Sequence, residues 1–359
     1  GKCVSLEVNS ENETTAKETI QEICEKLDID PAEFRILNVA KTGDRKADGT
    51  IHGSIGALET LEAAKAHPHY SAPLNGENTG RGIAIGFWMN GSGAACAVAN
   101  LHTDGKITLV EGSADIGGTR TSVSQQFAEV LGIPVEDIQP QVADTDSIGF
   151  TSGTGGSGAT IKSGLAAYQA AQEMKSQLVE RAAVLWETTP DQIDYSDGVM
   201  QLKNNSDRSL TFKELADKVI TLGGPVVGSA NIYPGGSAGA FNATIVDLEV
   251  DPETGKVNIL RYTALQDAGV AIHPGYVEGQ IQGGAVQGIG WALNEEYFMS
   301  DDGKMLNSSF LDYRMPTSLD LPMIDAVIVE VPNPCLLYTS PSPRDATLAR
   351  MPSSARKKK

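Results

Sequence analysis

Two neighbouring segments in which apolar and polar side chains alternate constrain the fold of this chain most strongly. They span residues 243–250 and 256–265 and flank the turn sequence DPETGK. An alternation with a period of two predicts β-strands. The short turn between them predicts an antiparallel pair in a sheet with one buried face.

Three further apolar runs between residues 82 and 112 also predict strands. Their sequences are GIAIGFWM, ACAVANL and KITLVEG, and Asp104-Gly105 between the last two is a hairpin signal. We therefore expect these three runs to form a meander.

Helical patterns separate the groups of strands. Apolar stripes with a helical period predict helices at about 15–28, 55–66, 122–133, 160–187 and 211–223. Thr15 with Glu18, and Thr211 with Glu214, have the Thr-x-x-Glu spacing of a capping box. Strand pairs grouped with intervening helices indicate an α+β architecture rather than a strict βαβ repeat.

The acidic composition excludes several classes of partner. A net charge of −18 at pH 7 argues against nucleic acid, because neutralising phosphates takes clustered Lys and Arg. No apolar run approaches the roughly 20 residues of a membrane helix, and the start of the chain lacks the apolar core of a secretory signal. We expect a cytoplasmic protein without a nucleic-acid or membrane partner.

The cysteines and histidines form no recognisable metal or redox motif. The four cysteines are scattered and lack CxxC pairs, so we expect reduced, mostly buried thiols and no iron–sulfur cluster within the chain. His67 and His69 in AHPHY could suggest a metal site. Pro68 between them, and the lack of a Cys or carboxylate nearby in the sequence, argue against it.

The composition changes abruptly after Pro334. Residues 335–359 are dense in Ser, Pro and Arg and carry six basic residues against one acid. Such a segment buries too little apolar surface to offset the entropy of ordering, so we expect a disordered tail. It resembles translated adapter or vector sequence, which would make it foreign to the protein. A basic interaction tail is the alternative.

Glycine-rich segments interrupt the regular pattern at three places, and glycine there implies positive φ or a close approach of the backbone. In the first, EGSADIGGTRTS, Gly117 and Gly118 lead into a helix, whose first N–H groups can bind an anion. A tight turn with a Ser/Thr cap is the simpler interpretation of this segment alone.

The second glycine segment, TSGTGGSGAT, directly precedes the long helix. Gly155 and Gly156 offer backbone N–H groups, and the hydroxyls of Ser157 and Thr160 add donors for a bound phosphate. The segment lacks the GxxxxGK[ST] order of a nucleotide P-loop. A flexible turn is the alternative interpretation.

The third segment, HPGYVEGQIQGGAVQGIGWAL, reads as a helix with five interior glycines. Glycine inside a helix costs about 0.5–1 kcal/mol relative to alanine, so the backbone should pass close to a ligand or another helix. Helix packing would explain the glycines. It would not explain Gln280, Gln282 and Gln287, the polar groups able to contact a ligand.

Taken in order, these segments resemble a known family. GSADIGGT, TGGSGAT, the strand pair around DPETGKV, DAGVAIHPGYVEGQIQGGAVQGIG and FLDYRMPTSLDLP together resemble the molybdopterin-binding large subunit of the xanthine dehydrogenase, aldehyde oxidase and carbon monoxide dehydrogenase family. The resemblance spans residues 14–334. It implies an α+β molybdenum-cofactor-binding domain fold with mixed sheets and packed helices.

The resemblance also divides the chain into four segments. Residues 1–50 would be the C-terminal end of a first molybdenum-cofactor-binding domain, and 51–82 a connecting segment. Residues 83–334 would form a second, truncated molybdenum-cofactor-binding domain, followed by the foreign or disordered tail at 335–359.

Cofactor-binding residues follow from the same resemblance. It implies that Gln280 contacts the molybdenum centre or its pterin, and that Ser157 reaches the cofactor phosphates. Gly155 and Gly156 would lie beside the metal and the substrate. The expected cofactor-binding residues are Gly117, Gly118, Thr119, Gly155, Gly156, Ser157, Thr160 and Gln280, and none of them ligates the metal directly.

Two positions depart from the family's pattern. The family's Met-Gly-Gln-Gly turn, whose Gln binds the cofactor, is replaced here by residues 116–119, Ile-Gly-Gly-Thr. The usual Asn before Pro274 is His273. Both changes bear on how the cofactor would be seated.

A molybdenum hydroxylase subunit fragment is the function that the resemblance implies, with an aldehyde or N-heterocycle as the small-molecule substrate and water as the source of oxygen. The cofactor would be molybdopterin or its cytosine dinucleotide form. Electrons would pass to an iron–sulfur subunit with 2Fe-2S clusters and to an FAD subunit.

The family's catalytic group is expected outside this chain. Its general-base glutamate lies in a Gly-x-Gly-Glu turn downstream of a Pro-Asn-Pro stretch, and here Pro332-Asn333-Pro334 is followed at once by the tail. The family's glycine-rich loop and arginine motif, expected upstream of Thr14, are missing as well. We therefore expect the fragment itself to be inactive.

Two alternative functions remain open on the sequence. One is a related molybdenum oxidoreductase of the carbon monoxide or hydroxybenzoyl-CoA type, which differs in residues upstream of this chain. The other is a non-catalytic module whose glycine loops hold another phosphorylated ligand.

Overall fold

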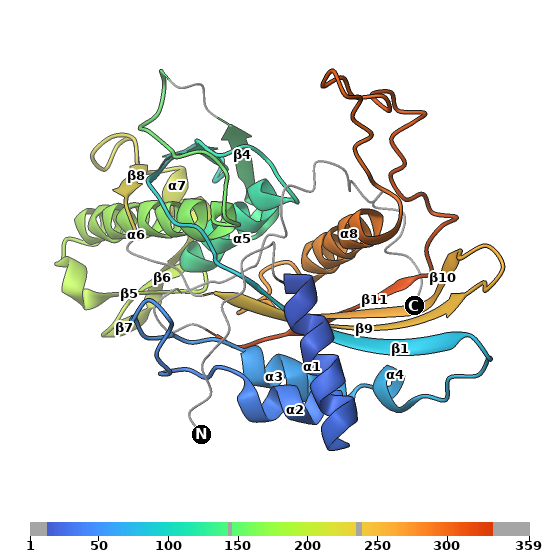
Figure 1. The fold of residues 1–359 in the computed structure, drawn as a ribbon. Coiled ribbons are helices and arrows are strands. Elements are labelled where there is room, and N and C mark those ends of the chain that lie inside the picture. The colour runs from blue at the N-terminus through green and yellow to red at the C-terminus, as the bar shows by residue number, and fades with distance from the viewer. Residues whose placement is uncertain (1–12, 143–145, 235–238, 333–359) are drawn as a thin grey trace. The chain divides into compact units, whose positions relative to one another are not determined.

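The computed structural model of the chain describes residues 13–142, 146–234 and 239–332 (Figure 1). Its internal contacts divide the chain into two compact units. The first unit combines the residues up to Met89 with those from 239 to 332, and the second unit spans residues 90–234.

The first unit is built on a four-stranded mixed sheet in the order β1-β9-β10-β11. Strands β9 and β10 form the predicted antiparallel pair around DPETGK, while β1 runs antiparallel to β9 and β11 runs parallel to β10. The strands are β1 (Thr79–Trp88), β9 (Ala240–Val250), β10 (Val257–Asp267) and β11 (Ile324–Val329).

Helices cover both faces of this sheet, as Figure 1 shows for α3 and α8. Leu265 of β10 packs in one apolar cluster with α3, whereas its neighbour Ala264 packs in another with α8, because successive strand residues point to opposite faces. The prediction of a single buried face is therefore wrong for β10. The helices of this unit are α1 (Glu13–Leu27), α2 (Pro31–Asn38), α3 (Ala57–Ala66), α4 (Pro68–Ser71) and α8 (Pro274–Leu293).

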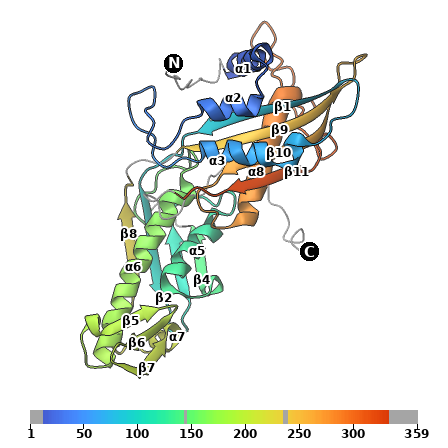
Figure 2. The same cartoon turned by 90° about the horizontal axis from the view of Figure 1, so that it is seen from below.

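The second unit packs two helices against a four-stranded sheet in the order β4-β3-β2-β8. Figure 2 shows α6 lying along β2 and β8. Alanines at 166, 167, 170 and 171 are fully buried in the core between α6, α5 and the sheet, and their small side chains let the helix approach closely.

Smaller elements complete the second unit. A three-stranded sheet, β5-β6-β7, lies with α7 near the C-terminal part of α6. The elements of this unit are β2 (Ala95–Leu101), β3 (Ile107–Glu111), α5 (Thr119–Leu131), η1 (Val135–Asp137), β4 (Ile138–Val142), α6 (Ala159–Leu185), η2 (Pro190–Gln192), β5 (Ile193–Ser196), β6 (Val199–Leu202), β7 (Asn205–Thr211), α7 (Phe212–Ala216) and β8 (Val227–Ile232).

The predicted strands form, but not all with the predicted partners. The hairpin at Asp104-Gly105 is confirmed, since β2 and β3 pair antiparallel and Gly105 has a φ of 80°. The three-stranded meander is wrong, because β1 pairs with β9 in the first unit, whereas β2 belongs to the second unit. Local hydrophobicity could not reveal a partner that lies about 150 residues away.

The helix predictions hold with one correction. The long helix is confirmed as α6, and the capping box of Thr211 and Glu214 is present at the start of α7. However, α7 ends at Ala216, so the predicted helix at 211–223 is too long. The side chains of the capping box at Thr15 and Glu18 lie outside the described residues.

The α+β fold class is confirmed by this mixture of sheets and packed helices. The division at Met89 and Asn90 follows contacts rather than family boundaries, so the segments 1–50, 51–82 and 83–334 stay predictions. Cys24 and Cys96 are buried free thiols, whereas Cys3, Cys335 and the tail at 335–359 lie outside the described residues. Among the described helices, none combines the length and apolarity needed to cross a membrane.

Candidate functional site

The first glycine turn leads directly into α5. Gly117 and Gly118 both have positive φ, 59° and 82°, a backbone conformation that residues other than glycine rarely adopt. Gly118 is the N-cap of α5, and the carboxylate of Asp115 accepts a hydrogen bond from the N–H of Arg120 in the first turn at 3.2 Å. The turn is closed by Thr119, whose hydroxyl and N–H donate to the carbonyl of Ile116 at 2.5 and 3.1 Å. The hydroxyl of Thr119 therefore has a structural partner.

Arg120 follows this turn and was not singled out from the sequence. Its Nε is buried and has no hydrogen-bond partner within the described part of the chain. A donor of this kind in the first turn of a helix favours an anion. The signal available in the sequence was an arginine directly after a Gly-Gly-Thr turn.

The second glycine loop is tightly held by Gly91. Gly156 has a φ of 58°, and the N–H of Gly91 donates to its carbonyl. A Cβ on Gly156 would lie 2.8 Å from the Cα of Gly91, so any side chain would displace the backbone. By contrast, Gly155 is exposed and a Cβ there would meet nothing within 4 Å. Gly155 thus faces open space, and Gly156 faces the protein.

Ser157 is the unusual residue of this loop. It is a non-glycine residue with a φ of 59°, and it is only 7% exposed. Its Oγ is buried and has no hydrogen-bond partner among the residues described. Strained backbone and an unpaired buried hydroxyl are both costly, and such features gather at ligand sites. Thr160, in the first turn of α6, is also buried.

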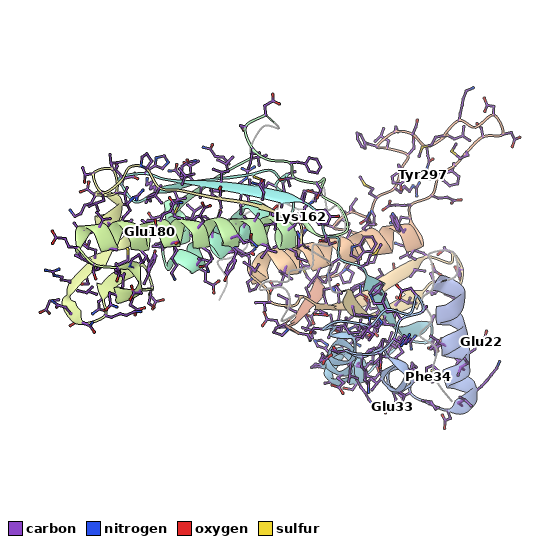
Figure 3. All side chains as sticks on the ribbon, turned by 90° about the vertical axis from the view of Figure 1, so that its left-hand side faces the viewer. Glu22, Glu33, Phe34, Lys162, Glu180 and Tyr297 are labelled. Carbon is purple, nitrogen blue, oxygen red and sulfur yellow. The ribbon has the colours of Figure 1, made fainter. Side chains whose placement is uncertain are left out.

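Lys162 lies at the start of α6, where Figure 3 labels it, and sequence reasoning gave it no role. Its side chain is almost fully buried, and its Nζ donates to the carbonyl of Ser152 at 2.6 Å and to that of Gly153 at 2.9 Å. Burial lowers the pKa of Lys162, while the nearby charge of Glu111 opposes this shift. A lysine in the first turn after a glycine loop was the available signal.

A buried polar network links the two glycine segments. The Oγ of Ser163, on α6, donates to the Oγ of Ser113 at 3.0 Å, and Ser113 donates to Glu111 through its N–H at 3.0 Å and its hydroxyl at 2.5 Å. Glu111 is fully buried, and burial raises the pKa of its carboxyl group. The structure thus joins the turn before α5 to the first turn of α6.

Gln280 belongs to the first unit, on α8. It is 6% exposed, and its Nε2 has no hydrogen-bond partner in the described ranges. The other two glutamines of this helix behave differently: Gln282 donates to the carbonyl of Ile324 at 3.1 Å, and Gln287 is exposed. Gln280 is therefore the glutamine of the three whose buried amide is left for a ligand.

His273 is the N-cap of α8, at the position where the resemblance leads us to expect Asn. Its Nδ1 accepts a hydrogen bond from the N–H of Tyr276 at 3.2 Å, and the two rings stack at 3.9 Å. An N-cap Asn side chain would accept the same kind of bond. The substitution therefore preserves the start of the helix.

The unpaired groups of the second unit fit a phosphate-bearing ligand. Ser157 Oγ and Arg120 Nε are buried hydrogen-bond donors there, and Gln280 Nε2 is a separate buried donor of the first unit. Donors of this kind suit phosphate oxygens and the carbonyl group of a pterin. Gly155, with open space where a side chain would project, leaves room for a ligand in the second loop.

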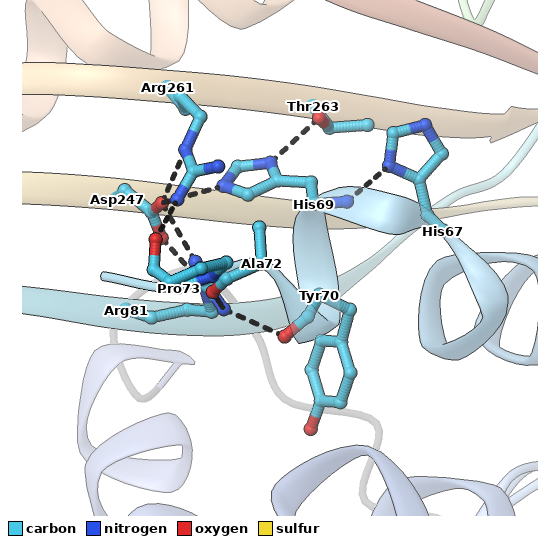
Figure 4. Close-up of polar contacts among 9 residues, drawn as sticks. All are labelled: His67, His69, Tyr70, Ala72, Pro73, Arg81, Asp247, Arg261 and Thr263. Carbon is cyan, nitrogen blue, oxygen red and sulfur yellow. Dashed lines mark hydrogen bonds and ion pairs between the residues drawn. The ribbon is translucent and has the colours of Figure 1, made fainter. Parts of the chain in front are cut away.

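His67 and His69 lie in a different environment, shown in Figure 4. His69 contacts Asp247 at 3.2 Å and Thr263 at 2.8 Å, and His67 contacts Asp325 at 3.3 Å. Burial lowers the pKa of His69 despite the carboxylate beside it. In the described residues no group of three or more His, Cys, Asp or Glu side chains is arranged to hold a metal ion. The carboxylate partners come from β9 and β11, which the local sequence could not show.

Comparisons with known proteins show which family and which individual proteins this chain is similar to. The sequence matches the molybdopterin cofactor-binding domain family over residues 57–322. It is 32% identical to the putative xanthine dehydrogenase molybdenum-binding subunit of Escherichia coli (strain K12), over 87% of this chain and 44% of that protein. It is 27% identical to the nicotine 6-hydroxylase large subunit of Paenarthrobacter nicotinovorans, over 89% of this chain and 43% of that protein.

Among solved structures, the chain resembles a Cu,Mo-CO dehydrogenase with a TM-score of 0.82, at 22% identity. This similarity covers 93% of the chain and 46% of the other, and at such an identity it shows the fold alone. It confirms the predicted cofactor-domain fold. The chain spans less than half the length of each of these three proteins.

Proposed function

Since the chain belongs to the molybdopterin cofactor-binding domain family, we propose that it provides part of the binding site for a molybdenum cofactor in an oxidoreductase subunit. The observation that carries the proposal is Ser157, a buried hydroxyl without a partner in the described structure, held in a left-handed conformation before α6.

The two glycine segments would bind the cofactor through different groups. Ser157 and the first N–H groups of α6 would bind phosphate oxygens, while Gly155 leaves room beside them. Gly117, Gly118 and Thr119 would line the site at the start of α5, where Nε of Arg120 is the unpaired donor, because the N–H groups of Thr119 and Arg120 already donate to Ile116 and Asp115. Thr160 would contribute through its place in the first turn of α6.

Gln280 would contact the pterin or the molybdenum centre from its place on α8. A buried amide that loses its partner costs about 1–3 kcal/mol, so an unpaired Nε2 is expected to be satisfied by a ligand. The dinucleotide form of the cofactor would need additional contacts, and its mononucleotide form would not.

For the whole protein we propose a molybdenum hydroxylase that acts on an aldehyde or an N-heterocycle in the cytoplasm. When bound, a molybdenum cofactor supplies the two-electron oxidation by which oxygen from water is inserted into a C–H bond. The relatives are named as subunits, which supports separate iron–sulfur and FAD subunits as electron acceptors. The residues described here would bind and orient the cofactor.

The test measures cofactor content directly. The chain is extended with the segments by which its relatives are longer, and it is co-produced with an iron–sulfur and an FAD subunit in a host that makes the cofactor. Molybdenum is measured by mass spectrometry and pterin by fluorescence of its oxidised form. The proposal requires both in about one copy per subunit. Phosphate-bearing ligand without pterin would instead support the non-catalytic module.

Ser157→Gly is the informative variant, because it removes the hydroxyl and also relieves the left-handed strain. Loss of one buried hydrogen bond should lower cofactor retention about tenfold. The thermal midpoint of the ligand-free chain should not fall. Ser209→Gly, on an exposed strand of the same unit, is the matched control. Full retention in Ser157→Gly would exclude this hydroxyl from the site.

A further inference from the structure

Lys162 anchors the backbone that enters the second glycine loop. Its Nζ donates to the carbonyl of Ser152 at 2.6 Å, to the hydroxyl of Ser152 at 2.9 Å and to the carbonyl of Gly153 at 2.9 Å. An ammonium group has three N–H donors, and here each of them has a protein acceptor. The side chain is 1% exposed, so these bonds are shielded from water.

A lysine at this place is electrostatically unfavourable for the helix itself. Lys162 lies in the first turn of α6, which begins at Ala159, and the start of a helix carries a partial positive charge. Burial of the ammonium adds a second cost. The carbonyl groups of Ser152 and Gly153 compensate for both. The presence of a lysine at this position is therefore explained by its hydrogen bonds to the glycine loop and not by a contribution to the stability of α6.

Glu111 is the buried charge that balances this arrangement. It ends β3, its residue is 0% exposed, and its Oε2 accepts two hydrogen bonds from Ser113. Ser113 in turn accepts a bond from Ser163, the neighbour of Lys162 on α6. Glu111 and Ser113 lead into the first glycine turn, whereas Lys162 and Ser163 follow the second loop.

We propose that Lys162 and Glu111 are positioning residues that hold the glycine segments 112–119 and 152–158 in one fixed arrangement relative to each other. Neither side chain needs to touch the cofactor. Lys162 acts on backbone carbonyl groups of the second segment, and Glu111 acts on the N–H and hydroxyl of Ser113 in the first. Only the consequence for cofactor retention rests on the proposed function. The fixed arrangement of the two segments does not depend on it.

The test compares Lys162→Met, Glu111→Gln and the double variant, each in the ligand-free 359-residue chain and in the extended, co-produced complex. Amide hydrogen exchange of residues 153–158 reports loop mobility, the thermal midpoint reports overall stability, and pterin content reports the site. Lys175→Met, on the same helix but over the ring of Tyr195, is the matched control.

Each single variant removes one of two opposite charges and leaves the other buried with hydrogen bonds alone, so each should have a lower thermal midpoint. The double variant removes both of these opposite charges, so its midpoint should lie above those of the single variants and close to that of the unchanged chain. Its amides at 153–158 should still exchange about tenfold faster, because the carbonyls of Ser152 and Gly153 have lost their donor. Pterin retention should likewise stay about tenfold lower.

A purely structural role predicts that all three measurements recover together in the double variant, and that result would overturn the proposal. Complete unfolding of all three variants would overturn it too, since the charges would then support the whole unit rather than the loops. A complex of the unchanged protein without pterin would contradict the proposed function alone. The exchange rates of the ligand-free chain would still decide the role of Lys162.

Discussion

Arg81 and Asp247 lie directly opposite each other on β1 and β9 and form a bidentate ion pair. Nε and one terminal nitrogen of Arg81 donate to the two carboxylate oxygens at 2.7 and 2.9 Å. Arg261, opposite Asp247 on β10, donates to the same carboxylate at 2.7 Å. One fully buried acid thus joins three adjacent strands (Figure 4).

Asp247→Asn should destabilise the first unit strongly. The substitution keeps the size of the side chain but leaves Arg81 and Arg261 without their anion. Breaking a buried ion pair in this way costs about 3 kcal/mol or more. Urea unfolding of the ligand-free chain measures the loss. Asp325→Asn, on neighbouring β11, is the control, because that exposed carboxylate contacts only His67 among the described charges. Equal losses in the two variants would contradict the role of Asp247.

The stability of the first unit should fall as the pH is lowered from 7 to 5. Burial lowers the pKa of His69 below its ordinary value of 6.5, and Arg81 and Arg261 oppose protonation while Asp247 favours it. The unfolded chain therefore binds a proton in this range that the folded chain does not bind. Stability is lost as the pH falls from the unfolded pKa towards the folded pKa.

His69→Gln should remove that part of the pH dependence, because glutamine does not titrate. The free energy of unfolding is measured at pH 7, 6 and 5 for both proteins. His102→Gln, at an exposed position of the second unit, should leave the slope as it is. An unchanged slope in His69→Gln would show that other groups cause the pH dependence.

Gln280→Ala should reduce molybdenum occupancy in the extended complex without changing the fold. The variant removes a buried donor that has no partner in the described protein structure, so the ligand-free chain loses little. A lost contact to the cofactor is worth about 1–3 kcal/mol, or roughly tenfold to a hundredfold in retention. Gln287→Ala, exposed on the same helix, is the control. Full occupancy in Gln280→Ala would exclude this amide from the site.

The segment after α8 should make the isolated chain associate with itself. Phe310, Leu311 and Leu319 of one segment are 97%, 91% and 95% exposed, and large apolar side chains exposed in this way promote association. Replacing these three residues with Ser should shift sedimentation towards the monomer. Phe150→Ser removes a single exposed ring of the second unit and should have less effect. Association that persists in the triple variant would place the contact elsewhere.

Much of the local structure could be predicted from the sequence, because it depends on residues that are close together in the chain. The alternation in 243–250 and 256–265 predicted β9 and β10, and Asp104-Gly105 predicted the turn between β2 and β3. In the glycine segments, positive φ or a close approach of the backbone was expected, and Gly117 and Gly156 have positive φ. These features depend on neighbours within a few residues, where backbone sterics and hydrophobic period act.

The candidate site could be predicted only in part, because the burial of its side chains and the pairing of their polar atoms depend on segments that are distant in the sequence. Ser157 and Gln280 were chosen from motifs, but only the structure shows that their polar atoms are buried and unpaired among described residues. Lys162 and Glu111 lie 51 positions apart in the sequence, and no local pattern connects them. The role of His69 depended on Asp247, which β9 brings beside it.

The sequence by itself determined the five longest helices, the strands β1, β2, β3, β9 and β10, the α+β class and the order of glycine segments by which the family is recognised. Tertiary structure decided which strand pairs with β1, which faces of β10 are covered and which polar groups find partners. The physical reason is that backbone conformation follows from nearby residues. Burial and charge pairing arise only when the chain brings remote side chains together, as β1, β9 and β10 do around Asp247.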